Sequence, residues 1–234
     1  MKSSAVGDAR RLLESCFLFR AFTPEERQRI LVHTHVHRFA AGEVIYHKGS
    51  PGHGMMAVLS GEVRISAPSP EGKEIVLSIV RPGEIFGELA LLDGKDRSAD
   101  CVALTPCELA SLERRDVLPL LRAQPEICLK LLEMLCDKLR GTTLQVEDLL
   151  FLQLPTRLAK TLLRMAGRRV SPSGEVGLHV RLSQRELGAM IGGTRESVNK
   201  CLAEWQRQGT IRMANGVIVI VDVDALRKLS EAEG

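Results

Sequence analysis

The sequence predicts an α+β protein built from three parts: an N-terminal β jelly roll, a long helix and a C-terminal winged helix-turn-helix. Three observations carry this prediction. Glycines recur every nine to eleven residues from position 42 to position 94, a stretch after Pro125 contains hardly any glycine, and a capped pair of short helices follows. We expect the three parts to span residues 12–124, 125–154 and 155–229.

The glycine-punctuated region is rich in valine, isoleucine and leucine, as in residues 55–67 and 73–80. Short apolar runs between turn residues are typical of antiparallel strands in a sandwich or jelly roll. A helical repeat would not be interrupted by glycine so often. The N-terminal part is therefore predicted to be an all-β domain.

The long helix carries an apolar pattern with coiled-coil spacing. A seam of this kind most simply pairs with its own copy, so we expect a homodimer through this helix. Packing against the helix's own domain is the alternative. The members of the seam follow one another at intervals of three and four residues: Leu132, Leu135, Leu139, Thr142, Val146 and Leu149.

Helix start and stop signals define two short helices near the C-terminus. Ser183 with Glu186 three residues later forms a capping box, which begins a helix. The pair Gly192-Gly193 ends that helix, and Thr194 can cap the next one. Two strand-like runs around Asn215-Gly216 then predict a tight hairpin.

Helix, turn, helix and hairpin together make a winged helix-turn-helix, in which the second helix enters the major groove of DNA. Residues 155–212 hold eleven Lys/Arg against four Glu, a net charge of +7 in a chain whose total is +3. This basic region favours a polyanionic partner, and the sequence predicts double-stranded DNA. The second helix also exposes Asn199 in its first turns. The residues expected to contact DNA are Ser183, Gln184, Thr194, Arg195, Glu196, Ser197 and Lys200.

The stretch "GELALLDGKDRSA", residues 87–99, places Glu88 and Arg97 inside an otherwise apolar segment. A salt bridge between these two side chains is one explanation. The other is an anionic ligand in the barrel, because a guanidinium offers charge-assisted, fork-shaped hydrogen bonds to a phosphate.

Taken with the order of the three parts, "GELALLDGKDRSA" and "SQRELGAMIGGTRESVNKCL" resemble the cyclic-AMP receptor protein and its regulator family (CRP/FNR), from about residue 12 to residue 229. The resemblance implies that Arg97 pairs with the phosphate of a cyclic nucleotide and that Glu88 accepts from the ribose 2′-hydroxyl. It implies cyclic AMP as allosteric effector, with two hydroxyls of the dimer helix reaching the adenine. The effector-binding residues it implies are Gly87, Glu88, Leu89, Ala90, Arg97, Ser98, Ala99, Thr142 and Thr143.

The resemblance also implies a TGTGA-like palindrome as the DNA site, with Lys200 standing where the family has an arginine. His33, His35 and His37 alternate as they would on one face of a strand. His35 and His37 resemble a histidine patch that contacts RNA polymerase in some family members. A metal site and a plain solvated surface are the alternatives.

Other functions find little support in the sequence. No apolar run is long enough for a membrane span and the N-terminus lacks a secretion signal, so we expect a cytoplasmic protein with no membrane partner. We expect no catalytic site and no bound metal, because no activated nucleophile, P-loop or CxxC pair is present. Two alternatives remain open: the same DNA-binding regulator responding to a different small molecule or a redox signal, and a nucleotide-binding regulatory subunit acting on a protein partner.

Overall fold

The structure is a computed structural model of the chain, and it describes residues 23–25, 27, 34–69, 74–166, 176–177, 182–214 and 217–231. The chain divides into two compact units, Met1–Pro68 with Leu77–Leu139 and Ser69–Val76 with Arg140–Gly234. The two strands of the hairpin expected around Asn215-Gly216 are present and pair antiparallel, with Ala214 opposite Val217. The turn residues Asn215 and Gly216 themselves, and His33, lie outside the described residues. In the part of the chain that is described, no helix has both the length and the hydropathy of a membrane span.

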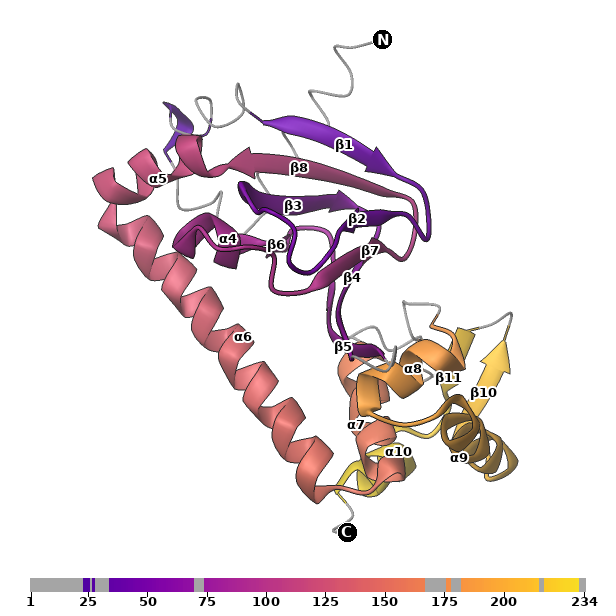
Figure 1. The fold of residues 1–234 in the computed structure, drawn as a ribbon. Coiled ribbons are helices and arrows are strands. Elements are labelled where there is room, and N and C mark those ends of the chain that lie inside the picture. Colours follow the sequence, from indigo (N-terminus) through magenta and orange to yellow (C-terminus); the bar gives the residue numbers. More distant parts are fainter. Residues whose placement is uncertain are drawn as a thin grey trace. The chain divides into compact units, whose positions relative to one another are not determined.

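The first unit is the predicted jelly roll, made of two four-stranded sheets (Figure 1). One sheet has the strand order β1 (His35–Phe39), β8 (Cys107–Glu113), β3 (Gly54–Ser60) and β6 (Ile85–Phe86). The other has the order β2 (Val44–Tyr46), β7 (Asp100–Ala103), β4 (Val63–Pro68) and β5 (Glu74–Val80). Strand β8 pairs antiparallel with both β1 and β3, and β7 does so with both β2 and β4.

Buried apolar side chains from both sheets fill the space between them, which explains the valine-rich runs of the sequence. Of the recurring glycines, Gly42, Gly61, Gly83 and Gly94 have positive φ values, as expected at turns. Gly61, between β3 and β4, has a φ of 81°, and a Cβ there would collide with the carbonyl of Pro106. One core cluster contains Val58, Val63, Val80, Phe86, Cys101, Ala103, Cys107 and Leu109.

Within residues 74–151, three helices belong to or leave this unit. The short helix α4 (Glu88–Asp93) lies between β6 and β7, and α5 (Arg114–Ala123) follows β8. The long helix α6 (Pro125–Phe151) begins in the unit, where Ile127 and Leu131 are buried against the second core cluster. The predicted long helix is therefore present, and its first two turns are part of the jelly-roll core.

The exposed apolar side of α6 differs in detail from the predicted seam. Leu149 packs within its own unit, because a Cβ on Gly192 would lie 2.7 Å from Leu149 Cδ2. Leu150 is instead 70% exposed, and Thr143 rather than Thr142 lies in line with it. We call the resulting set the exposed stripe; at intervals of three and four residues it contains Leu129, Leu132, Cys136, Leu139, Thr143, Val146 and Leu150.

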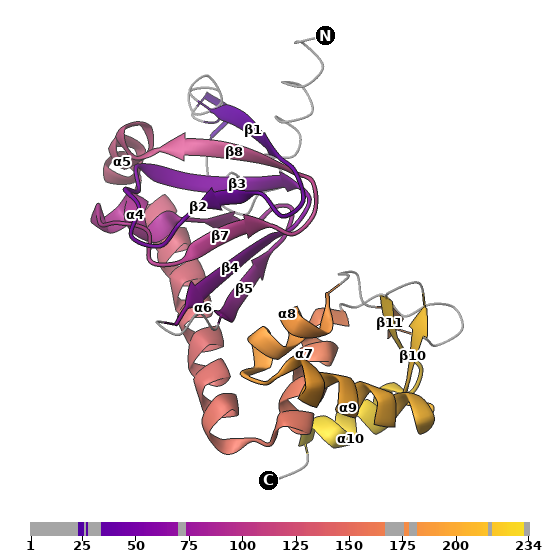
Figure 2. The ribbon, with the colours of Figure 1, turned by 45° about the vertical axis from the view of Figure 1, so that its right-hand side comes forward.

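The second unit is the predicted winged helix-turn-helix (Figure 2). Its helices are α7 (Leu154–Ala166), α8 (Gln184–Ile191), α9 (Arg195–Arg207) and α10 (Val223–Glu231). The wing is a three-stranded sheet of order β10 (Ile211–Ala214), β11 (Val217–Ile220) and β9 (Val176–Gly177). The buried side chains of its core include Leu158, Leu162, Leu187, Ile191, Val198, Leu202, Trp205, Ile220 and Leu226.

The predicted caps of α8 and α9 are confirmed. The Glu186 amide donates to Ser183 Oγ over 3.2 Å, and the Ser183 amide donates to Glu186 Oε2 over 2.7 Å. Gly192 ends α8 with a φ of 64°, a conformation that favours glycine. The Ser197 amide then donates to Thr194 Oγ1 over 3.1 Å. These bonds define the sharp turn that presents the first turn of α9.

Candidate functional site

Arg97 is the most unusual residue of the predicted cassette. Its side chain is only 9% exposed, and its Nη1 donates to the carbonyls of Gly54 at 2.8 Å and Gly87 at 3.0 Å. Among the residues that the structure describes, no carboxylate pairs with Arg97, and its buried Nε has no hydrogen-bond partner. A buried guanidinium with only neutral acceptors is costly, and a bound anion would offset that cost.

Backbone contacts and a glycine hold Arg97 in this position. The Arg97 amide donates to the Ser50 carbonyl over 2.9 Å, and its carbonyl accepts from the Gly49 amide over 2.8 Å. Gly87 has a φ of 74°, and a Cβ there would collide with Arg97 Nη1. The glycine predicted at this point is therefore needed both for the backbone turn and for the close approach of the guanidinium.

Glu88 does not pair with Arg97, so the structure does not support a simple salt bridge between them. Glu88 is 5% exposed, and its Oε1 accepts from Lys138 Nζ over 2.8 Å. Lys138 Nζ also donates to the Ile85 carbonyl over 3.1 Å. Because Lys138 lies on α6, this ion pair ties the cassette to the long helix within the first unit.

The remaining predicted effector residues differ in exposure. Ala90 and Ala99 are buried, whereas Leu89 and Ser98 are exposed. The first amides of α4, at Glu88 and Leu89, have no intrahelical carbonyl to bond, as at any helix start. Thr142 and Thr143 are exposed on α6 and belong to the second unit.

An aromatic ring completes the surroundings of Arg97. The guanidinium carbon Cζ lies 4.4 Å from the centroid of the Tyr46 ring, which itself lies near the ring of Phe86. Burial raises the pKa of the Tyr46 hydroxyl, and the neighbouring Cys101 thiol raises it further. Burial also raises the pKa of Cys101. Both groups are therefore neutral at physiological pH, and Arg97 is the charged member of this cluster.

Removing the amine of Lys138 should destabilise the first unit. Lys138→Met leaves the buried Glu88 carboxylate without its hydrogen-bonding cation. We expect a loss of about 1–3 kcal/mol in the free energy of unfolding, the usual cost of an unsatisfied buried polar group. Urea denaturation measures the loss.

A double-mutant cycle isolates the pair. With Glu88→Gln in place, Lys138→Met should cost about 0.5 kcal/mol or less, since no carboxylate is left unpaired. The matched control is Lys130→Met, which removes an exposed pair with Glu133 on the same helix and should cost about 0.5 kcal/mol or less. Equal costs of Lys138→Met in both backgrounds would rule out the coupling.

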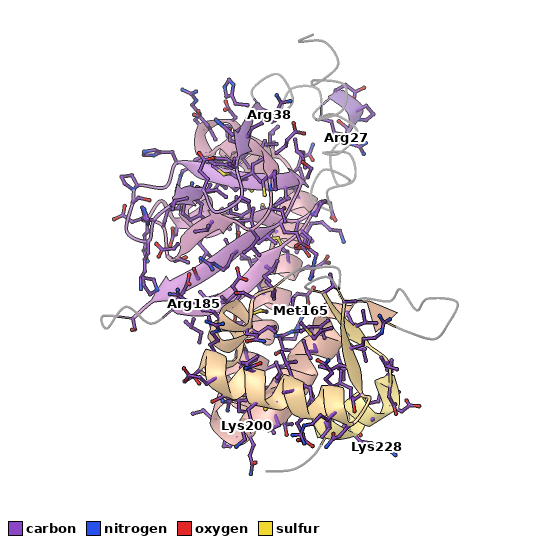
Figure 3. The ribbon with its side chains drawn as sticks, turned by 90° about the vertical axis from the view of Figure 1, so that its right-hand side faces the viewer. Arg27, Arg38, Met165, Arg185, Lys200 and Lys228 are labelled. Atoms are coloured by element: carbon purple, nitrogen blue, oxygen red, sulfur yellow. The ribbon has the colours of Figure 1, made fainter. Side chains whose placement is uncertain are left out.

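The predicted DNA-reading residues gather at the start of α9. Arg195, Glu196 and Lys200 are exposed, and no ion pair between described residues involves them. Figure 3 shows Lys200 on the outer side of α9. A helix surface of this kind offers donors for guanine and an acceptor for cytosine in the major groove.

The other members of the DNA set have structural partners. Ser183 and Thr194 cap their helices, and the Ser197 hydroxyl lies 3.0 Å from Thr194 Oγ1. Gln184 Nε2 donates to Asn199 Oδ1 over 3.1 Å. Gln184 is therefore a brace between α8 and α9 as well as a candidate DNA contact.

The two predicted polymerase-contact residues lie on the edge strand β1. His35 and His37 are both exposed, and His37 Nε2 lies 3.1 Å from Ser111 Oγ. The Ser111 hydroxyl also donates to the His35 carbonyl over 3.2 Å. Within the described ranges, no group of three or more His, Cys, Asp or Glu side chains could hold a metal ion.

The side chains and carbonyls that contact Glu88 and Arg97 were not predicted from the sequence. Lys138 lies one helical turn before Thr142, and this spacing on α6 could have suggested that it shares a face with the predicted adenine contacts. No local signal links Tyr46 or the Gly54 carbonyl to Arg97, because strand pairing and loop packing bring them together.

Comparisons with known proteins agree with both units. Residues 36–124 match the family described as cyclic nucleotide-binding domain, and residues 156–229 match the Crp-like helix-turn-helix domain. A "CRP-like cAMP-activated global transcriptional regulator" of Mycobacterium tuberculosis is 32% identical to this chain, over 81% of the chain and 85% of that protein.

Two solved structures are also similar. A transcriptional regulator of the CRP/FNR family from Thermus thermophilus is 33% identical with a TM-score of 0.71, covering 86% of this chain and all of the other. The c-di-GMP-responsive global regulator CLP of Xanthomonas campestris is 25% identical with a TM-score of 0.74, covering 85% of this chain and 99% of the other. The chain therefore belongs to the CRP/FNR family of transcription regulators, with a cyclic nucleotide-binding domain and a DNA-binding helix-turn-helix domain.

Proposed function

We propose that this chain is a homodimeric transcription regulator that binds cyclic AMP in its jelly roll and recognises a TGTGA-like palindrome through α9. The proposed working parts are the effector domain at residues 12–124, the dimerisation helix at residues 125–154 and the DNA-binding domain at residues 155–229. The protein acts in the cytoplasm, where its DNA partner lies.

The observation that carries the effector assignment is the environment of Arg97. The guanidinium is buried, has only neutral backbone acceptors and keeps an unpartnered Nε among the described residues. A cyclic nucleotide carries one phosphate anion, and a planar fork of N–H donors fits two phosphate oxygens. Arg97 therefore takes the phosphate, with Gly87, Ala90, Ser98 and Ala99 around the sugar phosphate.

In this proposal, Glu88 accepts a hydrogen bond from the ribose. Lys138 occupies Glu88 Oε1, and no hydrogen bond within the described residues reaches Oε2, which the ribose 2′-hydroxyl can use. The adenine is bonded by Thr142 and Thr143 of α6, one from each protomer. Both threonines are exposed, which supports a role in contacts outside their own unit.

The relative from M. tuberculosis is named as cAMP-activated, whereas the CLP regulator is named as responsive to c-di-GMP. Calorimetric titration of the full chain with cyclic AMP, cyclic GMP and c-di-GMP distinguishes the effectors. We expect one cyclic AMP per protomer, with weaker binding of the other two nucleotides. Binding of none of the three would overturn the cyclic-nucleotide proposal and favour a regulator with a different signal.

The exposed stripe of α6 supports the homodimer. Large apolar side chains such as Leu139 and Leu150 are 67% and 70% exposed in the single chain, although apolar residues at this spacing are normally covered by a second helix. A second copy of α6 related by a two-fold axis would cover the stripe with itself.

Cys136 allows this arrangement to be tested, because it is the exposed member of the described cysteines and lies in the stripe. In a parallel two-fold pair, each Cys136 faces its copy near the distance that a disulfide requires. We expect copper–phenanthroline oxidation to give a cross-linked dimer on a non-reducing gel. The test uses a Cys16→Ser variant, so that Cys16 cannot form the cross-link.

Two cysteine variants complete the cross-linking test. Adding Cys136→Ser should abolish the cross-link, while adding Cys201→Ser, on α9, should leave it unchanged. Sedimentation velocity gives the oligomeric state independently. A monomer at micromolar concentration, or a cross-link that survives without Cys136, would contradict pairing through this stripe.

RNA polymerase is the proposed protein partner. His35 and His37 are exposed on β1 at the edge of its sheet, which supports an intermolecular contact there.

A further inference from the structure

Tyr46 is the only tyrosine in the chain, and its ring lies against the buried arginine of the cassette. Tyr46 ends β2, and Arg97 precedes β7, which pairs with β2 through Tyr46 and Cys101. The distance of 4.4 Å between Arg97 Cζ and the ring centroid is well within the range of a cation–π contact. The strand pairing therefore places an aromatic ring beside the cation.

The ring adds a restraint that the hydrogen bonds of Arg97 do not supply. Among the described residues, both side-chain hydrogen bonds of Arg97 come from Nη1, to the carbonyls of Gly54 and Gly87, and its buried Nε has no partner. The Nε side of the guanidinium is therefore held by packing, and the Tyr46 ring, over which Arg97 Cζ lies, supplies part of that packing. A donor fork that is already oriented loses less conformational entropy when an anion binds.

We propose that Tyr46 is a positioning residue that sets the affinity of Arg97 for the effector's phosphate. This inference deepens the proposed function and depends on it. The aromatic ring, rather than the hydroxyl, does this, since the hydroxyl faces Cys101 and the ring faces Arg97. Tyr46 holds the guanidinium with its donor fork directed at the bound phosphate and does not itself bond the nucleotide.

Variants that keep or remove the ring separate this action from simple core packing. Tyr46→Phe retains the ring and should bind cyclic AMP within about twofold of the wild-type affinity. Tyr46→Leu and Tyr46→Met keep apolar bulk without a ring face and should weaken binding about 3- to 30-fold, the usual range for one partly buried cation–π contact. Phe39→Leu, which packs on the same core cluster, is the control for apolar loss and should change the affinity less than twofold.

A spectroscopic measurement tests the contact without ligand affinity. Because the chain has one tyrosine, ring-labelled tyrosine gives the NMR signal of Tyr46 alone. We expect that signal to shift when cyclic AMP is added, and to shift in ligand-free Arg97→Gln protein. An exposed replacement, Arg38→Gln, should leave the signal unchanged.

The outcomes distinguish this inference from the proposed function. If wild-type protein binds cyclic AMP and the ring-free variants bind equally well, the inference is wrong and the function stands. A Tyr46→Phe variant as weak as Tyr46→Leu would also overturn it, since the hydroxyl would then matter. If the wild-type protein binds no cyclic nucleotide, the proposed function fails first and the inference with it.

Discussion

Arg97→Gln is expected to weaken cyclic AMP binding by about 30-fold or more, because losing one partner of a buried, hydrogen-bonded charge pair costs about 2–5 kcal/mol. Glutamine keeps a hydrogen-bond donor but has no charge and no fork. The phosphate would enter a buried site without a cation. Calorimetric titration of cyclic AMP measures the change.

The same substitution should leave the fold nearly as stable as before. The Arg97→Gln variant loses the two hydrogen bonds from Nη1 to the carbonyls of Gly54 and Gly87. The substitution also removes a buried charge that has no carboxylate partner among the described residues. These effects oppose each other, so we expect the free energy of unfolding to change by about 1 kcal/mol or less.

Arg38→Gln is the matched control for this variant. Arg38 is an exposed arginine of the same unit that pairs with Glu108 on the surface, and its replacement should not affect cyclic AMP affinity. If Arg97→Gln and wild-type protein bound cyclic AMP with equal affinity, Arg97 would not be part of the nucleotide-binding site. An unfolded Arg97→Gln protein would show that the guanidinium is structural instead.

Arg195→Ala should weaken specific DNA binding about 5- to 150-fold, because one good arginine-to-guanine contact is worth about 1–3 kcal/mol. Arg195 is exposed at the first position of α9, with no ion pair to break among the described residues. Its loss should also relax discrimination at one base pair of each half-site. Fluorescence anisotropy with duplexes that vary one base pair at a time measures both effects.

Arg207→Ala provides the matched control, since it removes an arginine of the same helix that pairs with Glu204 at the far end. It should change specific affinity by less than about threefold, as expected of an exposed pair. If Arg195→Ala and Arg207→Ala had equal, sequence-independent effects, Arg195 would be a phosphate contact rather than a base reader.

Features governed by local chemistry were predictable from the sequence. The capping box at Ser183 and Glu186 and the glycine end of α8 at Gly192 depend on neighbouring residues, and both are present as predicted. The turn at Gly61 requires a backbone conformation that few other residues adopt, so the glycine spacing, together with the short apolar runs between the glycines, indicated the jelly roll.

Features that depend on distant side chains were not predictable. Lys138 and Glu88 are separated by 50 residues, and nothing in either local sequence shows that they form an ion pair. The predicted seam and the exposed stripe differ at Leu149, because the heptad pattern does not show that Gly192, at the end of α8, lies against that side chain. Periodicity gives the faces of a helix, whereas the neighbouring elements decide which face is left exposed.

The effect of cyclic AMP on DNA affinity tests the proposed function most directly. We would measure fluorescence anisotropy of a labelled duplex carrying TGTGA and TCACA six base pairs apart, at one fixed salt concentration, with cyclic AMP, with cyclic GMP and without nucleotide. We expect cyclic AMP to tighten binding, cyclic GMP to do so less, and Arg97→Gln protein not to respond. DNA binding of equal strength with and without cyclic AMP, at nucleotide concentrations that calorimetry shows to be saturating, would contradict it.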